Sequence, residues 1–255
     1  MELIDTHCHI HFADYPIDPA TAVENAAAAG VSKIICVGCS LHDSQLAVGL
    51  ARKFENVWAS VGAHPHDGKD FLEDPQAVEK LRKLVKKPKV VALGEIGLDY
   101  FHQHVPWDQQ EIVLRQQLEI GQQSGLPIIF HVRDAWDDFW RILADYDIKR
   151  AVVHSFSATK KELDQVLRRG FLVGLNGIMT FTKDEQQLEA AKQVPLERLI
   201  LETDAPFLTP KPHRGKVCEP KHVRDTAEFL ATLRGEELEI LAKKTTANAK
   251  ILFGI

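Results

Sequence analysis

The sequence predicts an α/β protein that folds as a single (β/α)8 barrel, or TIM barrel, over residues 1–255. Its 255 residues are the usual length of one such barrel. Eight short segments rich in Val, Ile and Leu recur along the chain without strict alternation, which is typical of parallel strands buried on both faces. Amphipathic segments lie between them. No Pro/Gly/Ser-rich linker divides the chain, so we expect one domain.

The expected strands come at the regular intervals of repeated βα units. They are residues 3–7, 33–38, 57–62, 90–95, 127–131, 151–154, 171–174 and 199–204. Periodicity does not show whether a sheet closes, so an open, doubly wound parallel sheet is the structural alternative.

The segments between these strands carry signals for the beginning and the end of helices. Two glycines, Gly30 and Gly170, follow amphipathic segments and predict helix ends. Acidic or hydroxyl residues predict four helix starts, two of them with a proline at the first helical position. These starts are Asp18-Pro19, Asp74-Pro75, the capping box Thr159/Glu162 and its variant Asp108/Glu111.

The composition excludes several classes of protein. Hydrophobic residues make up 45% and charged residues 26% of the chain, which is typical of globular proteins. No leader pattern and no run of eighteen apolar residues is present, so we expect a cytoplasmic protein without a membrane segment. The formal net charge of -5 requires any contact with nucleic acid to be local.

The four cysteines are too few for a disulfide scaffold, and we expect them to be reduced. Cys36 and Cys39 form a C-x-x-C motif, but no second pair accompanies it and Cys36 lies within an expected strand. We therefore predict neither a redox nor a zinc role for this motif.

Residues that can bind a metal follow five of the apolar segments. They are His7, His9, Glu95, His131, His154 and Asp204. A single histidine at a strand end is more often structural, but the strand ends of a barrel converge on one face, where the chemistry of such folds lies. His7 and His9 are two residues apart and project to the same side of their strand, with Cys8 facing the helices. Glu202 and Asp204 are expected to share a face of the last strand, with Glu202 deeper and hydrogen-bonded to a ligand.

Four histidines and two carboxylates exceed what one tetrahedral ion uses. We therefore expect two divalent metal cations per subunit, with one carboxylate bridging them. Mixed imidazole and carboxylate ligands accept Mg, Mn, Co or Zn in different degrees, so the identity of the metal stays open.

Six segments resemble, in order, the motifs of the TatD family of metal-dependent deoxyribonucleases. They are residues 5–9, 62–65, 94–100, 130–135, 153–157 and 201–206, and they span essentially the whole chain. The resemblance implies a TIM barrel related to the amidohydrolases. It implies that His7, His9, Glu95 and Asp204 hold one ion, and that Glu95, His131 and His154 hold the other. It also implies metal-dependent hydrolysis of DNA, in some members as a 3′-5′ exonuclease, whereas certain relatives deacylate D-aminoacyl-tRNA.

One segment departs from the family pattern. Residues 212–220 resemble its Arg-Gly-Lys-x-Asn-Glu-Pro stretch but have Cys218 where Asn is usual. The role of that position is therefore open, whereas the metal-binding positions are unaffected.

The expected reaction is the hydrolysis of DNA phosphodiesters, at ends or in single strands, by two cations and a bridging hydroxide. The water lies near Glu95, and Asp204 is a ligand and the proton acceptor. His64 is our candidate for contact with the phosphate or the leaving oxygen, and the alternative is an imidazole that caps the turn before Pro65.

Substrate binding is expected from a local cluster of positive charge. Seven Lys, Arg and His residues lie between Lys211 and Arg224. Arg214 is our first candidate for a phosphate contact and Arg133 the second, and the alternative is a solvated surface. Aromatic residues near the expected active face are candidates for stacking on bases, although buried packing is the alternative for each. They are Tyr100, Phe101, Trp107 and Trp136.

Two rival functions remain at this point. One is an amidohydrolase-type enzyme that cuts C-N or carboxylic ester bonds, including the ester of D-aminoacyl-tRNA. The basic segment and the absence of Lys at the fourth strand argue for phosphate instead. The other is a metal-stabilised scaffold without activity, which would not need Glu95 and Asp204 beside four histidines.

We expect the protein to be a monomer.

Overall fold

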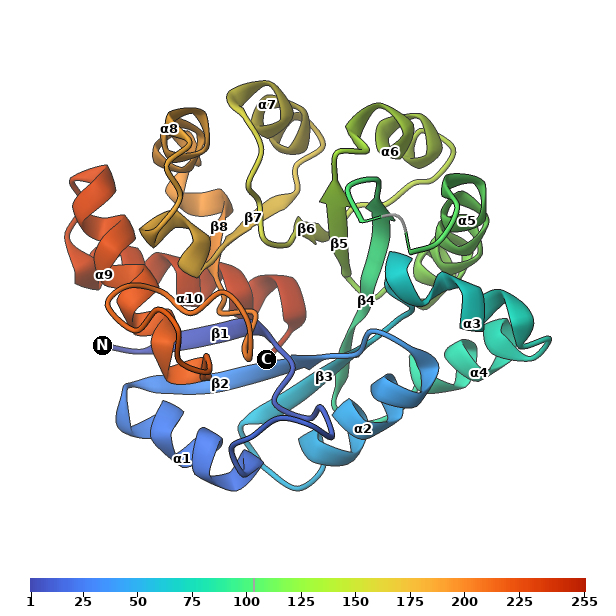
Figure 1. The fold of residues 1–255 in the computed structure, drawn as a ribbon, viewed down its shortest axis with the longest axis horizontal. Helices are drawn as coiled ribbons and strands as arrows, with labels where there is room; N and C mark the ends of the chain where they lie inside the picture. The colour runs from blue at the N-terminus through green and yellow to red at the C-terminus, as the bar shows by residue number, and fades with distance from the viewer. Residues whose placement is uncertain (103) are drawn as a thin grey trace. The chain divides into compact units, whose positions relative to one another are not determined.

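The computed structural model describes residues 1–102 and 104–255. Its eight strands form one sheet in the order β1 to β8, and helices alternate with them along the chain (Figure 1). The strands are β1 (Leu3–Cys8), β2 (Val31–Val37), β3 (Val57–Val61), β4 (Val90–Asp99), β5 (Ile128–Arg133), β6 (Ala151–Val153), β7 (Leu172–Leu175) and β8 (Leu199–Leu201). The sequential order of parallel strands confirms the predicted (β/α)8 class, since a doubly wound sheet reverses its strand order.

The chain divides into two compact units. The terminal unit comprises residues 1–36 and 155–255, and the central unit comprises residues 37–154. The expected single domain over residues 1–255 stays a prediction.

The terminal unit brings the first and last strands of the sheet together. The Thr6 hydroxyl donates to the Leu201 carbonyl at 2.9 Å, and Cys8 forms a parallel bridge with Ala205. Helix α10 packs on both strands. The helices of this unit are α1 (Pro19–Ala28), α7 (Lys160–Arg168), α8 (Glu185–Gln193), α9 (Val223–Arg234) and α10 (Leu238–Phe253), with 3-10 turns η2 (Gly177–Thr180), η3 (Leu196–Arg198) and η4 (Pro220–His222).

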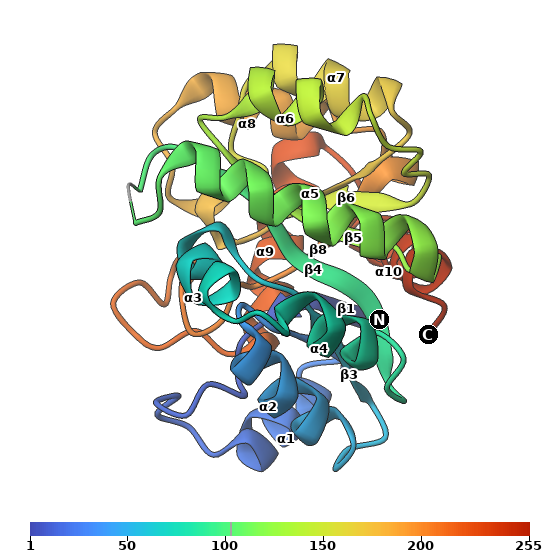
Figure 2. The same cartoon turned by 90° about the vertical axis from the view of Figure 1, so that its right-hand side faces the viewer.

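The central unit is built around β4, its longest strand. Gly97 of β4 pairs with His131 of β5, and a Cβ atom at Gly97 would lie 1.7 Å from the His131 carbonyl oxygen. Only glycine therefore allows the two strands to approach so closely there. Helix α5 lies against α3 and α4 (Figure 2). The helices are α2 (Leu41–Ala51), α3 (Gly68–Glu73), α4 (Ala77–Leu84), α5 (Trp107–Ser124) and α6 (Trp136–Leu143), with the 3-10 turn η1 (Pro65–Asp67).

Two of the predicted helix starts are confirmed. The Asp18 side chain caps α1 by accepting from the Thr21 N–H, with Pro19 as the first helical residue. Thr159 and Glu162 form the complete capping box of α7. The predicted stop signals Gly30 and Gly170 both have positive φ, at 88° and 75°, so each provides the left-handed turn that ends a helical segment.

The other two predicted starts are wrong. Helix α5 has Pro106 at its N-cap and no side-chain cap, so Asp108 lies inside the first turn, where its charge faces the helix dipole instead of capping. Helix α4 begins two residues beyond Pro75, and Asp74 accepts from the Gln76 N–H at 2.9 Å. The Asp74-Pro75 pair thus forms a turn before the helix instead of its first residues.

Among the described residues, no helix has both the length and the apolar character needed to cross a lipid bilayer.

Candidate metal-binding sites

The terminal unit brings three of the predicted ligands together, which we call the terminal cluster: His7, His9 and Asp204. The Nε2 atoms of the two histidines are 3.2 Å apart. Oδ1 of Asp204 lies 3.2 Å from His9 Nε2 and 3.6 Å from His7 Nε2. Both imidazoles are buried, at 1% and 3% exposure, whereas the Asp204 side chain is 16% exposed, so the three polar atoms converge on one point that solvent reaches from the Asp204 side.

The spacing of this cluster fits a divalent cation. Two ligand atoms that each lie about 2.1 Å from a tetrahedral ion are about 3.4 Å apart. The three distances within the terminal cluster, 3.2 to 3.6 Å, bracket that value. Two imidazoles and a carboxylate are also a ligand set that Zn²⁺ and related ions accept. The residues therefore fit a metal ion.

Backbone contacts between segments far apart in the sequence position this cluster. Asp5 accepts from the Thr203 backbone N–H at 2.9 Å and from the Thr203 hydroxyl at 2.6 Å. The Asp204 N–H donates to the His7 carbonyl at 2.8 Å. Burial raises the pKa of Asp5 well above its ordinary value, and the bonds to Thr203 and His7 offset this only in part. Asp5 and Thr203 are positioning residues that the sequence reasoning did not single out, although both lie inside the quoted motifs.

The expectation that Glu202 and Asp204 share a strand face is wrong. Strand β8 ends at Leu201, and Asp204 adopts a left-handed backbone with φ 66°, so strand alternation does not apply. The Glu202 Oε1 accepts from the Ser155 N–H at 2.7 Å and from the Asn176 amide at 3.2 Å. A Cβ atom at Gly174 would lie 2.4 Å from Glu202 Oε2, so this glycine provides the space for the buried carboxylate.

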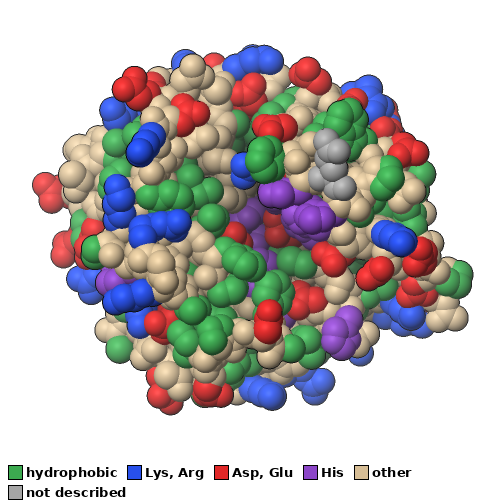
Figure 3. All heavy atoms as spheres, viewed as in Figure 1, with side chains coloured by type: hydrophobic (Ala, Val, Ile, Leu, Met, Phe, Trp, Pro, Cys, Tyr) green, Lys and Arg blue, Asp and Glu red, His purple; other side chains and the backbone are tan. Residues whose placement is uncertain are grey.

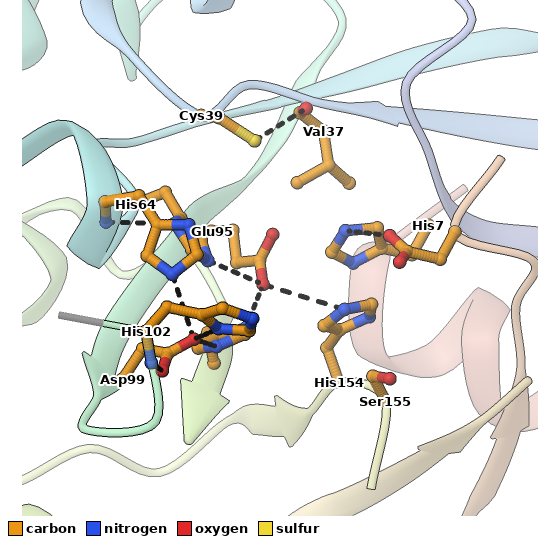
Figure 4. Close-up of polar contacts among 12 residues, drawn as sticks. His7, Val37, Cys39, His64, Glu95, Asp99, His102, His154 and Ser155 are labelled. Atoms are coloured by element: carbon orange, nitrogen blue, oxygen red, sulfur yellow. Dashed lines mark hydrogen bonds and ion pairs between the residues drawn. The ribbon is translucent and has the colours of Figure 1, made fainter. Parts of the chain in front are cut away.

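The central unit brings together three further predicted ligands, which we call the central cluster: Glu95, His131 and His154. Oε1 of Glu95 lies 2.8 Å from His131 Nδ1 and 3.6 Å from His154 Nε2. In Figure 4 the His154 side chain points toward Glu95 from a different part of the chain. The 3.6 Å separation is close to the ligand spacing of a divalent ion, whereas 2.8 Å is the distance of a hydrogen bond between Glu95 and His131. Glu95 was expected at a strand end, but β4 continues four residues beyond it to Asp99.

Asp99 supports the central cluster and was not among the predicted site residues. Its Oδ2 lies 3.0 Å from Nε2 of His131, so the His131 ring lies between two buried carboxylates. Asp99 is four residues beyond Glu95 and therefore on the same face of β4. That spacing is the signal that could have identified it. A carboxylate on the distal nitrogen of an imidazole fixes the orientation of the ring for metal binding.

The charges in the central cluster shift the pKa values of both His131 and Asp99. Burial lowers the pKa of His131, but hydrogen bonds to Asp99 and Glu95 outweigh it and raise the value to about 9. Burial raises the pKa of Asp99, yet bonds from His131, His66 and His102 hold it well below its usual range. When no metal is bound, the protonated His131 ring is therefore the cation that compensates the carboxylates of Glu95 and Asp99.

His64 lies beside Glu95, with 3.7 Å between its Nε2 and the Glu95 Oε1, as Figure 4 shows. Its Nδ1 accepts from the His66 backbone N–H at 3.1 Å, which caps η1. Burial lowers the pKa of His64 well below its ordinary value, mainly by desolvation. A neutral ring whose Nδ1 accepts must carry its proton on Nε2. His64 therefore presents a hydrogen-bond donor near Glu95, so the two roles weighed from sequence, capping and donation, are compatible.

The two predicted substrate-binding arginines both lie over aromatic rings. The guanidinium of Arg214 is 3.8 Å from the centre of the Phe181 ring, and its Nη1 donates to the Thr209 carbonyl at 2.8 Å. Arg133 lies 4.5 Å above the ring of Phe101, which is 57% exposed. Arg214 on its loop and Arg133 at the end of β5 are thus held in place, while each retains further N–H donors.

The candidate stacking residues differ in exposure, and Cys218 is buried. Trp107 is 52% exposed and stacks on Tyr100 with 4.4 Å between ring centres, whereas Trp136 packs against Phe139 in α6. Cys218 is fully buried, and its carbonyl accepts from the Tyr15 hydroxyl at 3.2 Å. The Cys218 side chain therefore belongs to the packed interior of the terminal unit.

Each unit therefore assembles one half of the predicted ligand set. The expected bridging of both ions by Glu95, and with it the total number of ions, stays a prediction.

Comparison with known proteins identifies a family over nearly the full length. A family model described as TatD related DNase matches residues 4–254. A Bacillus subtilis (strain 168) protein named uncharacterized metal-dependent hydrolase YabD is 36% identical over 255 residues, covering 99% of both chains. A Citrobacter koseri protein named 3′-5′ ssDNA/RNA exonuclease TatD is 33% identical, again over 99% of each. The crystal structure of the TatD homologue YjjV from Escherichia coli K12 superposes with a TM-score of 0.91 at 30% identity, covering 99% of this chain and 98% of that one.

Proposed function

The chain belongs to the TatD related DNase family and is a metal-dependent hydrolase, and from this premise we propose that it hydrolyses phosphodiester bonds in single-stranded DNA or at DNA ends. The observation that carries the proposal is the pair of ligand clusters, each with two imidazole nitrogens beside a carboxylate oxygen, which in the terminal cluster lie at the spacing of a divalent ion. The Citrobacter koseri relative named as a 3′-5′ ssDNA/RNA exonuclease supports digestion from the 3′ end.

We propose up to two divalent cations per subunit, Mg, Mn or Zn. His7, His9 and Asp204 would hold one, and Glu95, His131 and His154 the other. When bound, such cations supply Lewis acidity that offsets the negative charge of a phosphodiester. His131 would bind through Nδ1, because its Nε2 faces Asp99.

Two residues are proposed to act on the reacting atoms. Asp204 is the proton acceptor for the attacking water, and its side chain is 16% exposed, which leaves it accessible from solvent. His64 is the donor, since its Nε2 carries the proton of a neutral ring. A donor at that position stabilises negative charge on a phosphate oxygen or on the leaving oxygen.

Arg214 and Arg133 are proposed to bind the substrate. A guanidinium forms charge-assisted hydrogen bonds to phosphate with two parallel N–H groups. Phe101 lies beneath Arg133 and is largely exposed, so this pair offers both a phosphate contact and an aromatic ring for an unpaired base. These contacts favour single strands, in which bases are free to stack on protein.

The decisive experiment tests metal and substrate together. Protein treated with a chelator is assayed with added Mg, Mn or Zn on single strands labelled at the 3′ or the 5′ end, and on D-aminoacyl-tRNA. We expect no turnover without metal and stepwise release from the 3′ end with it. Full activity in the metal-free sample would exclude the metal mechanism. Hydrolysis of the aminoacyl ester without cleavage of DNA would replace the proposed substrate class.

A matched pair of variants tests the central cluster. Glu95→Gln keeps the side-chain volume but removes the charge, so we expect activity to fall by more than about 100-fold, beyond the usual cost of losing a group that only supports a ligand. Glu79→Gln, on the exposed face of α4, is the control and should keep full activity. Equal rates for the two variants would reduce Glu95 to a structural residue.

A further inference from the structure

A second group of histidines surrounds Asp99 in the central unit, next to the central cluster. His66 belongs to η1 after β3, and His102 follows the end of β4. Nε2 of His66 and Nδ1 of His102 each lie 3.0 Å from Oδ2 of Asp99. All three ligand atoms lie within 4.8 Å of one another. Asp99 thus has imidazole nitrogens on its outer side in addition to His131.

The number of donors around Asp99 exceeds what its oxygens accept well. Oδ1 already accepts from the backbone N–H groups of Phe101 and His102, at 3.0 and 2.8 Å. Oδ2 has three imidazole nitrogens at 3.0 Å, whereas an oxygen offers only two lone pairs. His131 uses one of them to orient its ring. The approach of both His66 and His102 is therefore better explained by a shared cation than by two more hydrogen bonds.

We propose that His66, Asp99 and His102 form a separate zinc site. Two imidazoles and one carboxylate suit Zn²⁺, whereas Mg²⁺ prefers oxygen ligands alone. The two distances from Asp99 Oδ2, each 3.0 Å, are a few tenths of an ångström below the roughly 3.4 Å of tetrahedral ligands, a difference that small side-chain rotations remove. Three protein ligands leave a fourth position for water.

The surroundings of this site permit the entry and the retention of an ion. The His66 and His102 side chains are 30% and 42% exposed, and histidines are visible on the molecular surface in Figure 3. A cavity of about 330 Å³ adjoins His66 and is also lined by Asp67 and Asp70. The His104 ring lies 4.5 Å from that of His66. Zinc can therefore reach the site from solvent without passing through the central cluster.

A comparable group in the terminal unit does not qualify. His213, His222 and Asp225 also lie close together. However, Nδ1 of His222 accepts from the Glu219 backbone N–H at 3.0 Å, which places the proton of the neutral ring on Nε2. A protonated nitrogen is not a metal ligand.

Counting bound zinc tests the proposal. The full chain, His66→Gln, His102→Gln and the control His42→Gln, whose imidazole is exposed on α2, are saturated with Zn²⁺, dialysed and analysed for metal. We expect wild type and His42→Gln to retain one ion more than either of the other variants. Equal zinc content in all four proteins would overturn the site. Asp99 is left unchanged because it also orients His131.

Two further measurements keep the test independent of folding and of activity. Thermal unfolding of each variant is recorded first, and either histidine variant that unfolds like wild type suffices for the count. Replacing zinc by Co²⁺ should give wild type an additional visible absorption of a tetrahedral N/O site that both histidine variants lack. Identical spectra would also overturn the proposal. Neither readout requires substrate, so a failed nuclease assay would leave this result intact.

Discussion

The terminal and central clusters present the same kinds of ligand but are positioned in different ways. In the terminal cluster the ligands are positioned by bonds to neighbouring residues and to the backbone, from Thr203 to the Asp5 carboxylate and from the Asp204 N–H to the His7 carbonyl. In the central cluster a chain of side chains, Glu95 to His131 to Asp99, sets the geometry. An ion that enters the central cluster must therefore displace a proton from His131, so metal binding in this cluster is linked to pH.

The largest effect is expected from Asp204→Asn, which removes both a ligand charge and the proposed proton acceptor. Activity should fall by more than about 100-fold, and bound metal should fall by one ion while the central cluster keeps its own. Turnover rates and elemental analysis are the measurements. Asp14→Asn, at an exposed position, is the control. Loss of all bound metal from Asp204→Asn would show that the two clusters do not bind ions independently.

The metal-free protein should lose stability as the pH rises. The pKa of His131 is raised from 6.5 to about 9, so its stabilising contribution is complete below 6.5 and disappears as the pH passes through 9. One pKa unit corresponds to about 1.4 kcal/mol, which sets an upper limit of about 3 kcal/mol. Urea unfolding of the metal-free wild type and of His131→Gln, at about pH 6 and pH 9.5, should show their stability difference shrinking at high pH. A constant difference would mean that His131 is not the imidazolium of the cluster.

Asp99→Asn should affect the central cluster less than the loss of one of that cluster's own ligands, because Asp99 acts on the central cluster through His131. We expect a reduction of about 10- to 100-fold in metal affinity or activity. Without the Asp99 charge the pKa of His131 falls, so metal binding should extend to lower pH than in wild type. Asp70→Asn on α3, an exposed position, is the matched control. If the pH dependence of metal binding is unchanged in Asp99→Asn, the hydrogen bond from His131 to Asp99 does not control metal binding in the central cluster.

The smallest effects are expected from the arginines, one in each unit. Arg214 already donates to Thr209 and lies over Phe181, so we expect Arg214→Ala to cost about 1.5 kcal/mol, the low end for a charge-assisted hydrogen bond, or about tenfold in kcat/KM. The metal content should be unchanged and the salt dependence shallower, and Arg214→Lys should recover part of the loss. Arg133→Ala on the same substrates provides the comparison. If Arg214→Ala has the same kcat/KM and the same salt dependence as wild type, the basic segment between Lys211 and Arg224 is a solvated surface and does not bind the substrate.

The eight strands and the candidate ligands could be predicted from the sequence. Buried parallel strands need continuous apolar segments, so each strand is visible in the sequence, and a polar residue that follows one stands out. The pairing of His7 with His9 followed from strand alternation alone. The family motifs implied the division of the ligands between two ions with Glu95 in both sets, and the structure places three of the six ligands in each unit.

The orientation of these residues depends on tertiary contacts. The length of β4, which puts Glu95 in mid-strand and adds Asp99, depends on its pairing with β5 through Gly97. The left-handed backbone of Asp204 and the inward turn of Glu202 depend on partners about 200 and 26 to 47 positions away in the chain. Short-range sequence patterns report local propensity and burial, whereas these contacts form only when distant segments pack together, so no local signal specifies them.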